Sequence, residues 1–484
     1  MKDAPALVWF RRDLRISDNP ALEAAIQGRR PVLPVFIWAP EEEAPWAPGS
    51  ASRWWLHQSL EALDGSLGEH GSTLILRRGP TLEALLSLAA EAGATAVYWN
   101  RLYEPAAMAR DRVIEEALLK RGLVAESFPG SVLFEPGTIL NSEGQPFRVF
   151  TAFWRACLKA PAPPGSAQSP KRIPAPSRWP QSLPLSDLGL EPCIDWAAGM
   201  RAAWKPGEAG AAEQLRIFLD HGMGDYSVQR DRPDHRGTSR LSPHLHFGEV
   251  SAREVWHASH TASETFLRQI VWREFAHHLL FHYPQTPREP LRPEFAFFPW
   301  RLDETELRAW TRGTTGYPLV DAGIRELWHT GWMHNRVRMV VASFLVKHLL
   351  ISWQEGAAWF WDTLVDADLA NNTMGWQWAA GCGADAAPYF RIFNPVIQGQ
   401  RFDPHGDYVR RWAPELSKLP AAWIHKPWQA PASLLLDAGI TLGKTYPAPM
   451  VVHDASRKRA LAALASIKKP GDGARGPRGA QSFK

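Results

Sequence analysis

The feature that most constrains the fold is an alternation of short apolar runs and helical patterns over residues 1–130. Four apolar runs have the length and composition of buried strands, at residues 7–10, 32–38, 73–76 and 96–99. Asp18 or Asn19, and Thr81, are suitable N-caps for the helical segments between them, at residues 19–25, 54–63 and 81–90. Alternation at this spacing predicts an α/β domain with a doubly wound parallel sheet.

The rest of the chain divides into three further regions. Pro, Ser and Ala dominate much of residues 136–204, which predicts an interdomain connector that orders few contacts. Residues 205–465 carry apolar residues three and four apart with almost no alternation, which predicts a larger all-α domain. Residues 466–484 are rich in Gly, Lys and Arg, which predicts a disordered basic tail. With residues 1–135 as the α/β domain, we expect two folded domains.

The composition limits the class of protein. Of the 484 residues, 45% are hydrophobic and 21% charged, as in ordinary globular proteins. No apolar run reaches the about 18 residues needed to span a bilayer, and the acidic start, Met1-Lys2-Asp3-Ala4, argues against a signal peptide. Three widely spaced cysteines favour a reducing, cytoplasmic setting.

Two quantities are unusual. The net charge of +4 weakly indicates a polyanionic partner. The 24 tryptophans amount to about one residue in twenty. They indicate either a large aromatic core or indoles used for stacking and electron transfer, and composition leaves both interpretations open.

Residues 237–244 combine polar groups with a helix start. Thr238 and Ser239 offer hydroxyls and main-chain amides ahead of a helix that begins near Ser242, and Arg240 adds a positive charge. This combination suits a phosphate or pyrophosphate, and equally an ordinary capped helix.

Two helical segments carry polar and aromatic residues on one face. Gln269, Trp272 and Ala276 lie at i, i+3 and i+7 and share a face. A second stripe consists of Trp332, Asn335 and Met339. Because a buried, unsatisfied amide costs roughly 1–3 kcal/mol, an Asn on such a stripe needs a partner.

Metal-binding and dinucleotide patterns are weak. Asp366 and Asp368 can bind Mg²⁺ or pair with arginines such as Arg338, and the nearby arginines favour ion pairs. Residues 381–386 fit GxGxxA but follow a helical segment rather than a strand. No third-ligand pattern accompanies the neighbouring histidines, so we expect ordinary helix residues at His277, His278 and His282.

Six motifs occur in the order found in one protein family. They lie at residues 8–15 (Val-Trp-Phe-Arg-Arg-Asp-Leu-Arg), 237–243, 272–275 (Trp-Arg-Glu-Phe), 315–318 (Thr-Gly-Tyr-Pro), 333–336 (Met-His-Asn-Arg) and 385–395. Through them the chain resembles the DNA photolyase/cryptochrome family over about residues 5–460. The Trp54-Trp55-Leu-His segment and the C-terminal half look most like the bacterial class III cyclobutane-dimer photolyases.

The resemblance implies an α/β antenna domain and a helical domain that holds FAD folded into a U. The pyrophosphate and ribityl region would contact Tyr226, Thr238, Ser239, Arg240, Leu241 and Ser242. The isoalloxazine ring would be surrounded by Arg338, Asp366, Asp368 and Asn372, with Asn372 near the flavin N5.

The resemblance also implies an electron relay and a pocket for damaged DNA. The relay would run through Trp376, Trp353 and Trp300. Trp272 and Trp378 would form an aromatic wedge against a flipped-out pyrimidine dimer, beside Asn335 and Met339. Photolyases for the (6-4) lesion carry histidines at the last two positions, so these residues favour cyclobutane dimers. Candidates for phosphate contacts on a basic rim are Arg336, Arg391, Arg401, Arg410 and Arg411.

One residue departs from the family pattern. Cyclobutane-dimer photolyases have a glutamate three residues before the Trp of Trp-Arg-Glu-Phe, where this chain has Gln269. Glutamine cannot transfer a proton, and loss of one preorganised donor costs about 2.7–4 kcal/mol in the strongest cases. Two hypotheses follow: a dimer-splitting photolyase with reduced efficiency, or a cryptochrome-like photoreceptor with little or no repair. An ordinary flavin oxidoreductase lacks support, because no nicotinamide motif is present.

The antenna and the partners are less constrained. Folate-binding photolyases carry an Asn-Glu pair shortly after Tyr-Glu, whereas Tyr103-Glu104 is followed here by Pro-Ala-Ala-Met. Methenyltetrahydrofolate, a deazaflavin, another flavin and an empty pocket therefore all stay open. We expect a monomer that acts on UV-damaged DNA, with no membrane association and with any signalling partner unknown.

Overall fold

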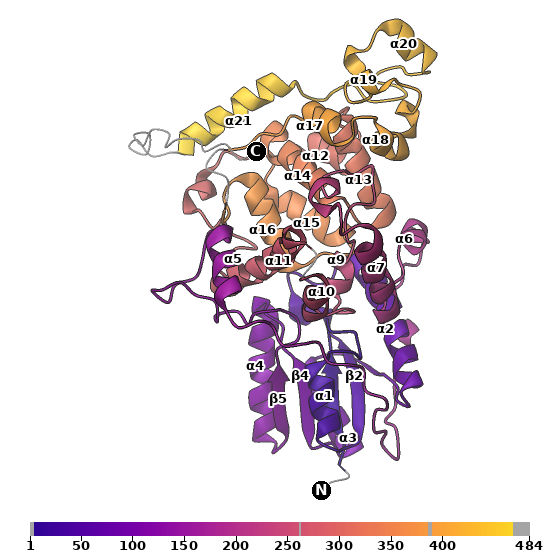
Figure 1. Ribbon diagram of the computed structural model, residues 1–484, viewed down its shortest axis with the longest axis vertical. Helices are drawn as coiled ribbons and strands as arrows, with labels where there is room; N and C mark the ends of the chain where they lie inside the picture. Colours follow the sequence, from indigo (N-terminus) through magenta and orange to yellow (C-terminus); the bar gives the residue numbers. More distant parts are fainter. Residues whose placement is uncertain (1–3, 261–262, 386–389, 468–484) are drawn as a thin grey trace.

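The computed structural model describes residues 4–260, 263–385 and 390–467, and it has an α/β domain below a larger helical domain in Figure 1. The α/β domain is built on a five-stranded parallel sheet of order β3-β2-β1-β4-β5, so the chain winds outward from β1 in both directions. The strands are β1 (Ala6–Phe10), β2 (Val32–Trp38), β3 (Ile75–Arg78), β4 (Ala96–Asn100) and β5 (Val124–Phe128). The helices are α1 (Pro20–Gln27), η1 (Pro40–Glu43), α2 (Ser50–Glu69), α3 (Thr81–Ala92) and α4 (Pro105–Lys120). The predicted fold class is confirmed.

Three local expectations in this domain need correction. Strand β5 was not predicted, because its five residues are all at least partly exposed and form no apolar run. Strand β3 lies two residues later than expected, since Arg77 and Arg78 extend its pairing with β2. Thr81 is the first residue of α3 rather than its N-cap, and its amide donates to Glu42 Oε1 at 2.7 Å.

The connector between the domains makes many ordered contacts, so that expectation is wrong. It contains α5 (Phe150–Lys159), η2 (Leu185–Leu188) and α6 (Ala198–Ala203). Its backbone accepts hydrogen bonds from Asp18 N at Ala167 O (3.1 Å) and from Val32 N at Pro174 O (2.7 Å). Ile173 is fully buried against the α/β domain. Proline removes donors but leaves the carbonyls, and these serve as acceptors here.

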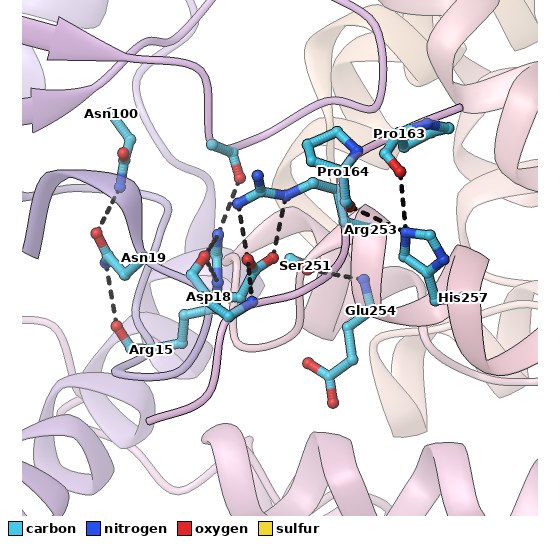
Figure 2. Close-up of polar contacts among 12 residues, drawn as sticks. Arg15, Asp18, Asn19, Asn100, Pro163, Pro164, Ser251, Arg253, Glu254 and His257 are labelled. Atoms are coloured by element: carbon cyan, nitrogen blue, oxygen red, sulfur yellow. Dashed lines mark hydrogen bonds and ion pairs between the residues drawn. The ribbon is translucent and has the colours of Figure 1, made fainter. Parts of the chain in front are cut away.

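A polar cluster joins α1, the connector and α10 (Ala252–Ser259), as Figure 2 shows. The buried carboxylate of Asp18 accepts from Arg253 Nε (3.1 Å), from Arg253 Nη2 (2.8 Å) and from Ala167 N (3.0 Å). His257 Nε2 lies 3.1 and 2.9 Å from the carbonyls of Pro163 and Pro164. Because carbonyls only accept, this nitrogen must carry the proton. The cluster fixes the connector to both domains.

The remaining described elements form the helical domain, apart from isolated β-bridges. Its first half contains α7 (Glu208–His221), α8 (Tyr226–Gln229), α9 (Ser242–His246), α10, α11 (Glu264–His282), η3 (Pro293–Phe297), α12 (Glu304–Thr311), α13 (Pro318–Thr330), α14 (Asn335–Ser343) and the π-helix η4 (Phe344–Leu349). Its second half contains α15 (Trp353–Thr363), α16 (Leu369–Ala380), α17 (Pro395–Phe402), α18 (Asp407–Trp412), η5 (Pro414–Leu416), α19 (Ala421–Ile424), η6 (Pro427–Gln429), α20 (Ala432–Asp437) and α21 (His453–Ile467). None of the helices in the described residues is long and apolar enough to cross a membrane.

The centre of this domain is α16, which packs against α11, α14 and α15 (Figure 1). A shared apolar core also crosses the domain boundary and includes Trp55, Trp204, Phe247 and Trp332. Trp55 Nε1 donates to the buried Glu249 at 2.9 Å. Many of the tryptophans therefore belong to the core. Two predicted features fall partly outside the described residues: positions 386–389 of the motif at 385–395, and positions 468–484 of the expected tail.

Candidate functional site

The predicted phosphate-binding loop, residues 237–242, connects α8 to α9. Thr238 and Ser239 are half-buried, and the Ser239 carbonyl accepts from Gln214 Nε2 at 2.9 Å. Leu241 is 1% exposed and packs into the core. Within the described residues the Thr238 hydroxyl has no protein partner, which leaves it available to a ligand.

Tyr226 stands at the start of α8, beside the loop. Its ring packs edge-on against Phe218 and Phe266, with centroid distances of 5.6 and 5.2 Å. Burial raises the pKa of Tyr226. The hydroxyl therefore stays protonated and can act as a hydrogen-bond donor.

Arg240 differs from its expected role as an anion-facing charge. Its backbone is left-handed, with φ of +52°. Its guanidinium carbon lies 4.2 Å from the Trp204 ring centroid and 4.9 Å from the Trp332 ring centroid. The charge is thus held by two indole faces. Trp332 Nε1 in turn donates to Ser242 Oγ at 3.2 Å, which leaves the exposed Ser242 hydroxyl hydrogen free to donate elsewhere.

Arg338 and Asp366 form an ion pair. The nearby arginines had favoured this interpretation of Asp366 over a role in binding Mg²⁺. Arg338 Nη2 lies 3.0 and 2.8 Å from the two carboxylate oxygens of Asp366, and its Nε donates to the Met333 carbonyl at 2.7 Å. Within the described residues no group of three or more His, Cys, Asp or Glu side chains is arranged to hold a metal ion. The charge of this carboxylate is therefore compensated by the guanidinium of Arg338.

Asp368 caps α16 and faces two histidines. Its Oδ1 accepts from Asn371 N at 2.8 Å, and its Oδ2 lies 3.8 Å from His246 Nδ1 and 3.6 Å from His277 Nε2. Burial alone would raise the pKa of Asp368, but His277, His246 and Arg273 hold it well below the usual range. Asp368 therefore stays a carboxylate in the interior.

Two of the three neighbouring histidines on α11 pack against each other. His278 Nε2 accepts from Phe147 N at 3.0 Å. Burial lowers the pKa of His278 to about 4, so the ring is neutral and part of the packing. His282 packs edge-on against it at 4.6 Å between centroids.

Asn372 and Trp376 lie one turn apart on α16. Asn372 Nδ2 donates to the Ala357 carbonyl of α15 at 3.0 Å, which ties the two helices together. The Trp376 ring packs edge-on against Phe360 at 5.0 Å. A Cβ atom at Gly356 would lie 2.1 Å from the Trp376 ring, so glycine is required for this close approach.

The three tryptophans predicted as a relay belong to one apolar cluster. Trp376 and Trp353 are each 2% exposed, whereas Trp300 is half-buried. Trp300, the last residue in the predicted order, is thus the most exposed of the three, as expected for a path that ends at the surface. The relay itself stays a prediction.

Gln269 on α11 has a partner that the sequence did not indicate. Its Oε1 accepts from Arg230 Nη2 at 3.0 Å, and its Nε2 donates to the Thr265 carbonyl at 3.4 Å. The two side chains come from positions 39 residues apart, and no local pattern links them. One amide hydrogen of Gln269 stays free, because a primary amide has two.

Trp272 lies on α11 and Trp378 on α16, and both are half-buried. Trp272 stacks on Phe150 of α5, with centroids 3.7 Å apart and planes 7° apart. Asn335, at the start of α14, is exposed, and Met339 one turn later is half-buried. Since α16 contacts both α11 and α14, the residues predicted for the wedge lie on adjoining helices.

The predicted phosphate-binding arginines differ in how free they are. Arg336 pairs with Asp231 at 2.8 Å, whereas Arg391, Arg401 and Arg411 are exposed. Arg410 donates to the carbonyls of His405, Ser417 and Leu419. Its guanidinium is occupied by this loop, so the expectation of a phosphate contact there is wrong.

A pocket lies at the carboxyl ends of β1 and β2. It is lined by aromatic and charged side chains from both domains, among them Trp9, Trp38, Arg11, Arg110, Glu43 and His246. A second pocket shares Arg12, Leu102 and His246 with it and extends to Asp368. The two pockets thus lead from the sheet edge toward the predicted flavin residues.

The residues of the helical domain suit a flavin dinucleotide. Hydroxyl donors of Tyr226, Thr238 and Ser242 suit phosphate and ribityl oxygens at one end. At the other end the Arg338–Asp366 pair and Asn372 present charges and an amide for a polar ring. A helical domain with this donor set, joined to a doubly wound α/β domain, defines a two-domain flavoprotein of the photolyase type.

The chain belongs to the DNA photolyase/cryptochrome family. Residues 6–176 match the family described as DNA photolyase, and residues 266–466 match the FAD binding domain of DNA photolyase. The chain is 50% identical over 478 residues to a deoxyribodipyrimidine photo-lyase of Agrobacterium fabrum, covering 97% of this chain and 99% of that one.

Two further relatives agree with this assignment. A crystal structure of a bacterial class III photolyase from Agrobacterium tumefaciens has a TM-score of 0.93 and 50% identity, covering 97% of this chain and 98% of that one. Cryptochrome-1 of Arabidopsis thaliana is 43% identical, covering 96% of this chain and 70% of that protein. The resemblance to the family and to class III photolyases is therefore confirmed.

Proposed function

We propose that the protein binds FAD in its helical domain and uses blue light to split cyclobutane pyrimidine dimers in DNA. The observation that carries the proposal is the packing of α16 against α11, α14 and α15, four helices that hold most residues expected for the flavin ring and the dimer. The full-length similarity to a deoxyribodipyrimidine photo-lyase supports the same conclusion.

The bound FAD would supply light absorption and the electron that opens the dimer. Arg338, Asp366 and Asn372 would hold its ring. Its phosphate and ribityl part would be held by Tyr226, Thr238, Ser239 and Ser242. Arg240 would support this part indirectly, through its contact with the Trp332 ring. Trp272 and Trp378 would stack on the flipped-out dimer. The free amide hydrogen of Gln269 would donate to a dimer carbonyl. Trp376, Trp353 and Trp300 would carry electrons between the surface and the site.

A second candidate function is a cryptochrome-like blue-light photoreceptor with little or no repair. The observation that favours it is the engagement of Gln269 by Arg230 and by the Thr265 carbonyl, which limits its use toward a substrate. The 43% identity to a plant cryptochrome is in line with this alternative. We place dimer repair first, with reduced efficiency, because Gln269 keeps one donor.

The deciding experiment measures repair directly. Photoreduced protein is mixed with an oligonucleotide that carries one thymine dimer, and dimer loss is followed under blue light. We expect measurable repair by the native protein, and repair about tenfold faster by Gln269→Glu at acidic pH, where the carboxyl is protonated. Repair by the variant alone would favour the photoreceptor. Repair by neither would overturn the proposed enzyme function.

A matched control separates the site from the added charge. Gln27→Glu makes the same change at an exposed position on α1 in the α/β domain. It should repair dimers at the native rate. Flavin content, measured by absorbance, is compared among all three proteins so that differences in cofactor loading are excluded.

We also propose that the pocket at the carboxyl ends of β1 and β2 holds an antenna chromophore. Phe36 and Trp38 contribute aromatic side chains to its lining. Arg11, Arg12 and Arg110 line it as donors that pair with the carboxylates of Asp111 and Glu104. Methenyltetrahydrofolate, a deazaflavin or a second flavin would each satisfy this chemistry.

The absorption and fluorescence excitation spectra of the purified holoprotein identify the ligand. An excitation band beyond those of FAD should appear and should be lost in Trp38→Ala. A spectrum of FAD alone, unchanged after incubation with each candidate chromophore, would overturn the antenna proposal.

We further propose that the protein is a monomer in the cytoplasm. The free thiols of Cys157, Cys193 and Cys382 support this compartment, because a reducing environment keeps thiols free.

A further inference from the structure

Lys347 is a buried lysine for which the proposed chemistry has no use. It lies in the π-helix η4, where every residue is buried, and it is 1% exposed. Burial lowers its pKa to about 7. Among the described residues, the titratable group that faces it is the Cys382 thiol, whose pKa burial raises to about 12 and which therefore stays neutral. A buried amine is costly to keep, so its contacts indicate what it does.

Both contacts of the Lys347 amine go to one short segment. Its Nζ lies 3.2 Å from the centroid of the Phe390 ring and donates to the Arg391 carbonyl at 3.3 Å. The Phe390 ring also approaches Gly381, where a Cβ atom would lie 3.1 Å from its Cδ2. The amine thus holds the main chain at Arg391 and the ring beside it.

The other end of this segment is held from the same face of the helix. Ser343 lies one turn before Lys347, at i and i+4, and its Oγ accepts from Phe393 N at 3.3 Å. Asn394 then caps α17 by accepting from Val396 N at 3.0 Å. The segment is therefore fixed at both ends, and the exposed side chain of Arg391 lies between them.

We propose that Lys347 is a positioning residue for DNA binding, which holds the main chain at residues 390 and 391 so that the exposed Arg391 meets a DNA phosphate. This inference rests on the proposed DNA binding of the same protein. π-Helical turns are frequently found at functional sites, and this turn brings an amine into contact with the segment. A merely apolar anchor would pack here without the cost of burying an amine.

The test is a double-mutant cycle on DNA affinity. Native holoprotein, Lys347→Met, Arg391→Gln and the double variant are titrated with a fluorescent duplex carrying one thymine dimer, over a range of salt concentrations. Each single variant should bind about tenfold more weakly, with a salt slope smaller by about 0.9. The double variant should bind no more weakly than Arg391→Gln, because Lys347 acts through Arg391.

Two controls keep the outcomes distinct. Lys120→Met removes a charge from an exposed position in the α/β domain and should leave affinity and slope near native. Ser343→Ala releases the other end of the segment without touching the buried amine. The loss of DNA affinity that this variant causes should also vanish in the Arg391→Gln background. Ser343→Ala serves as the test if Lys347→Met does not fold.

Four results would each overturn either the positioning role or the proposed function. Native affinity in Lys347→Met, or losses that multiply in the double variant, would overturn the positioning role. An unchanged salt slope with weaker binding would also overturn it, since packing damage alone does not remove a phosphate contact. No binding of dimer-containing duplex by the native protein would instead overturn the proposed function.

Discussion

Gln269 is paired with a cation, and this changes what a glutamate at the same position would do. Its Oε1 accepts from Arg230 Nη2 at 3.0 Å. A carboxylate there would form an ion pair, and the nearby guanidinium would lower the carboxyl pKa. A glutamate beside Arg230 would then be ionised at neutral pH and unable to transfer a proton. Restoring the family residue therefore does not by itself restore an acid.

We predict that repair by Gln269→Glu depends on pH, whereas repair by the native protein does not. The carboxyl must be protonated to act as an acid, so its repair rate should fall as the pH rises from about 5 to 8. In the double variant Gln269→Glu/Arg230→Gln this fall in repair rate should occur at higher pH, because no guanidinium lowers the pKa of the new carboxyl. Rates of dimer loss at fixed light intensity provide the measurement. Parallel profiles for both variants would contradict the role given to Arg230.

A second prediction concerns Asp366. Asp366→Asn removes the carboxylate that pairs with the Arg338 guanidinium, beside the position expected for the flavin ring. The affinity for FAD should fall about tenfold, the size expected for one charged hydrogen bond. Release of flavin fluorescence on dilution measures it. Asp437→Asn, at an exposed position on α20, is the control, and equal flavin retention in both variants would refute the assignment.

At the scale of elements, buried strands were predictable and exposed ones were not. Strands β1, β2 and β4 are runs of buried apolar residues and lie where the sequence indicated. Strand β5 alternates between exposed and half-buried positions, so hydrogen bonding to β4 defines it rather than its composition. The connector was misjudged for a related reason, since its main-chain carbonyls make contacts that side-chain patterns do not encode.

The approach of α15 to α16 leads to a third prediction. Gly356→Ala would bring a methyl group within 2.1 Å of the Trp376 ring, so we expect a loss of about 1–3 kcal/mol in the free energy of unfolding. Gly375→Ala on α16 is matched in residue type but meets nothing within 4 Å, and it should stabilise by about 0.5–1 kcal/mol. Urea unfolding measures both. Similar values for the two variants would contradict the close packing.

At the scale of the molecule, the site is assembled from positions that no local pattern connects. The spacing of Asp366 and Arg338 allowed an ion pair to be expected, and the structure contains it. The stacking of Trp272 on Phe150 and the pairing of Gln269 with Arg230 join distant parts of the chain. The contacts of Arg240 with two indole rings could not be predicted, because the partners lie about 36 residues before it and 92 residues after it. Such contacts depend on the tertiary fold.

Four buried histidines make stability depend on pH across the whole molecule. Burial lowers the pKa of His348 to about 3, and of the others to about 4: His278, His334 and His425. Each is neutral in the fold but protonated in the unfolded chain below about pH 6.5. The unfolded state then binds more protons, so the free energy of unfolding falls as the pH drops below about 6.5.

We therefore predict that the protein is several kcal/mol less stable at pH 5 than at pH 7. Each histidine contributes about 2 kcal/mol to the loss. Two buried acids oppose it by about 1–2 kcal/mol each, since burial raises the pKa of Glu326 to about 7 and of Asp403 to about 6. Urea unfolding at the two pH values tests the balance. Equal or greater stability at pH 5 would show that the histidines are not neutral in the fold.

The connector that lies along the α/β domain also has a consequence for biosynthesis. Val32 of β2 and Asp18 donate to carbonyls at positions 174 and 167, and Leu14 N donates to the Phe247 carbonyl. A ribosome releases the chain from its N-terminus, so these partners emerge long after the last strand. The α/β domain should thus stay incomplete, and in need of chaperones, until about half of the polypeptide has been translated.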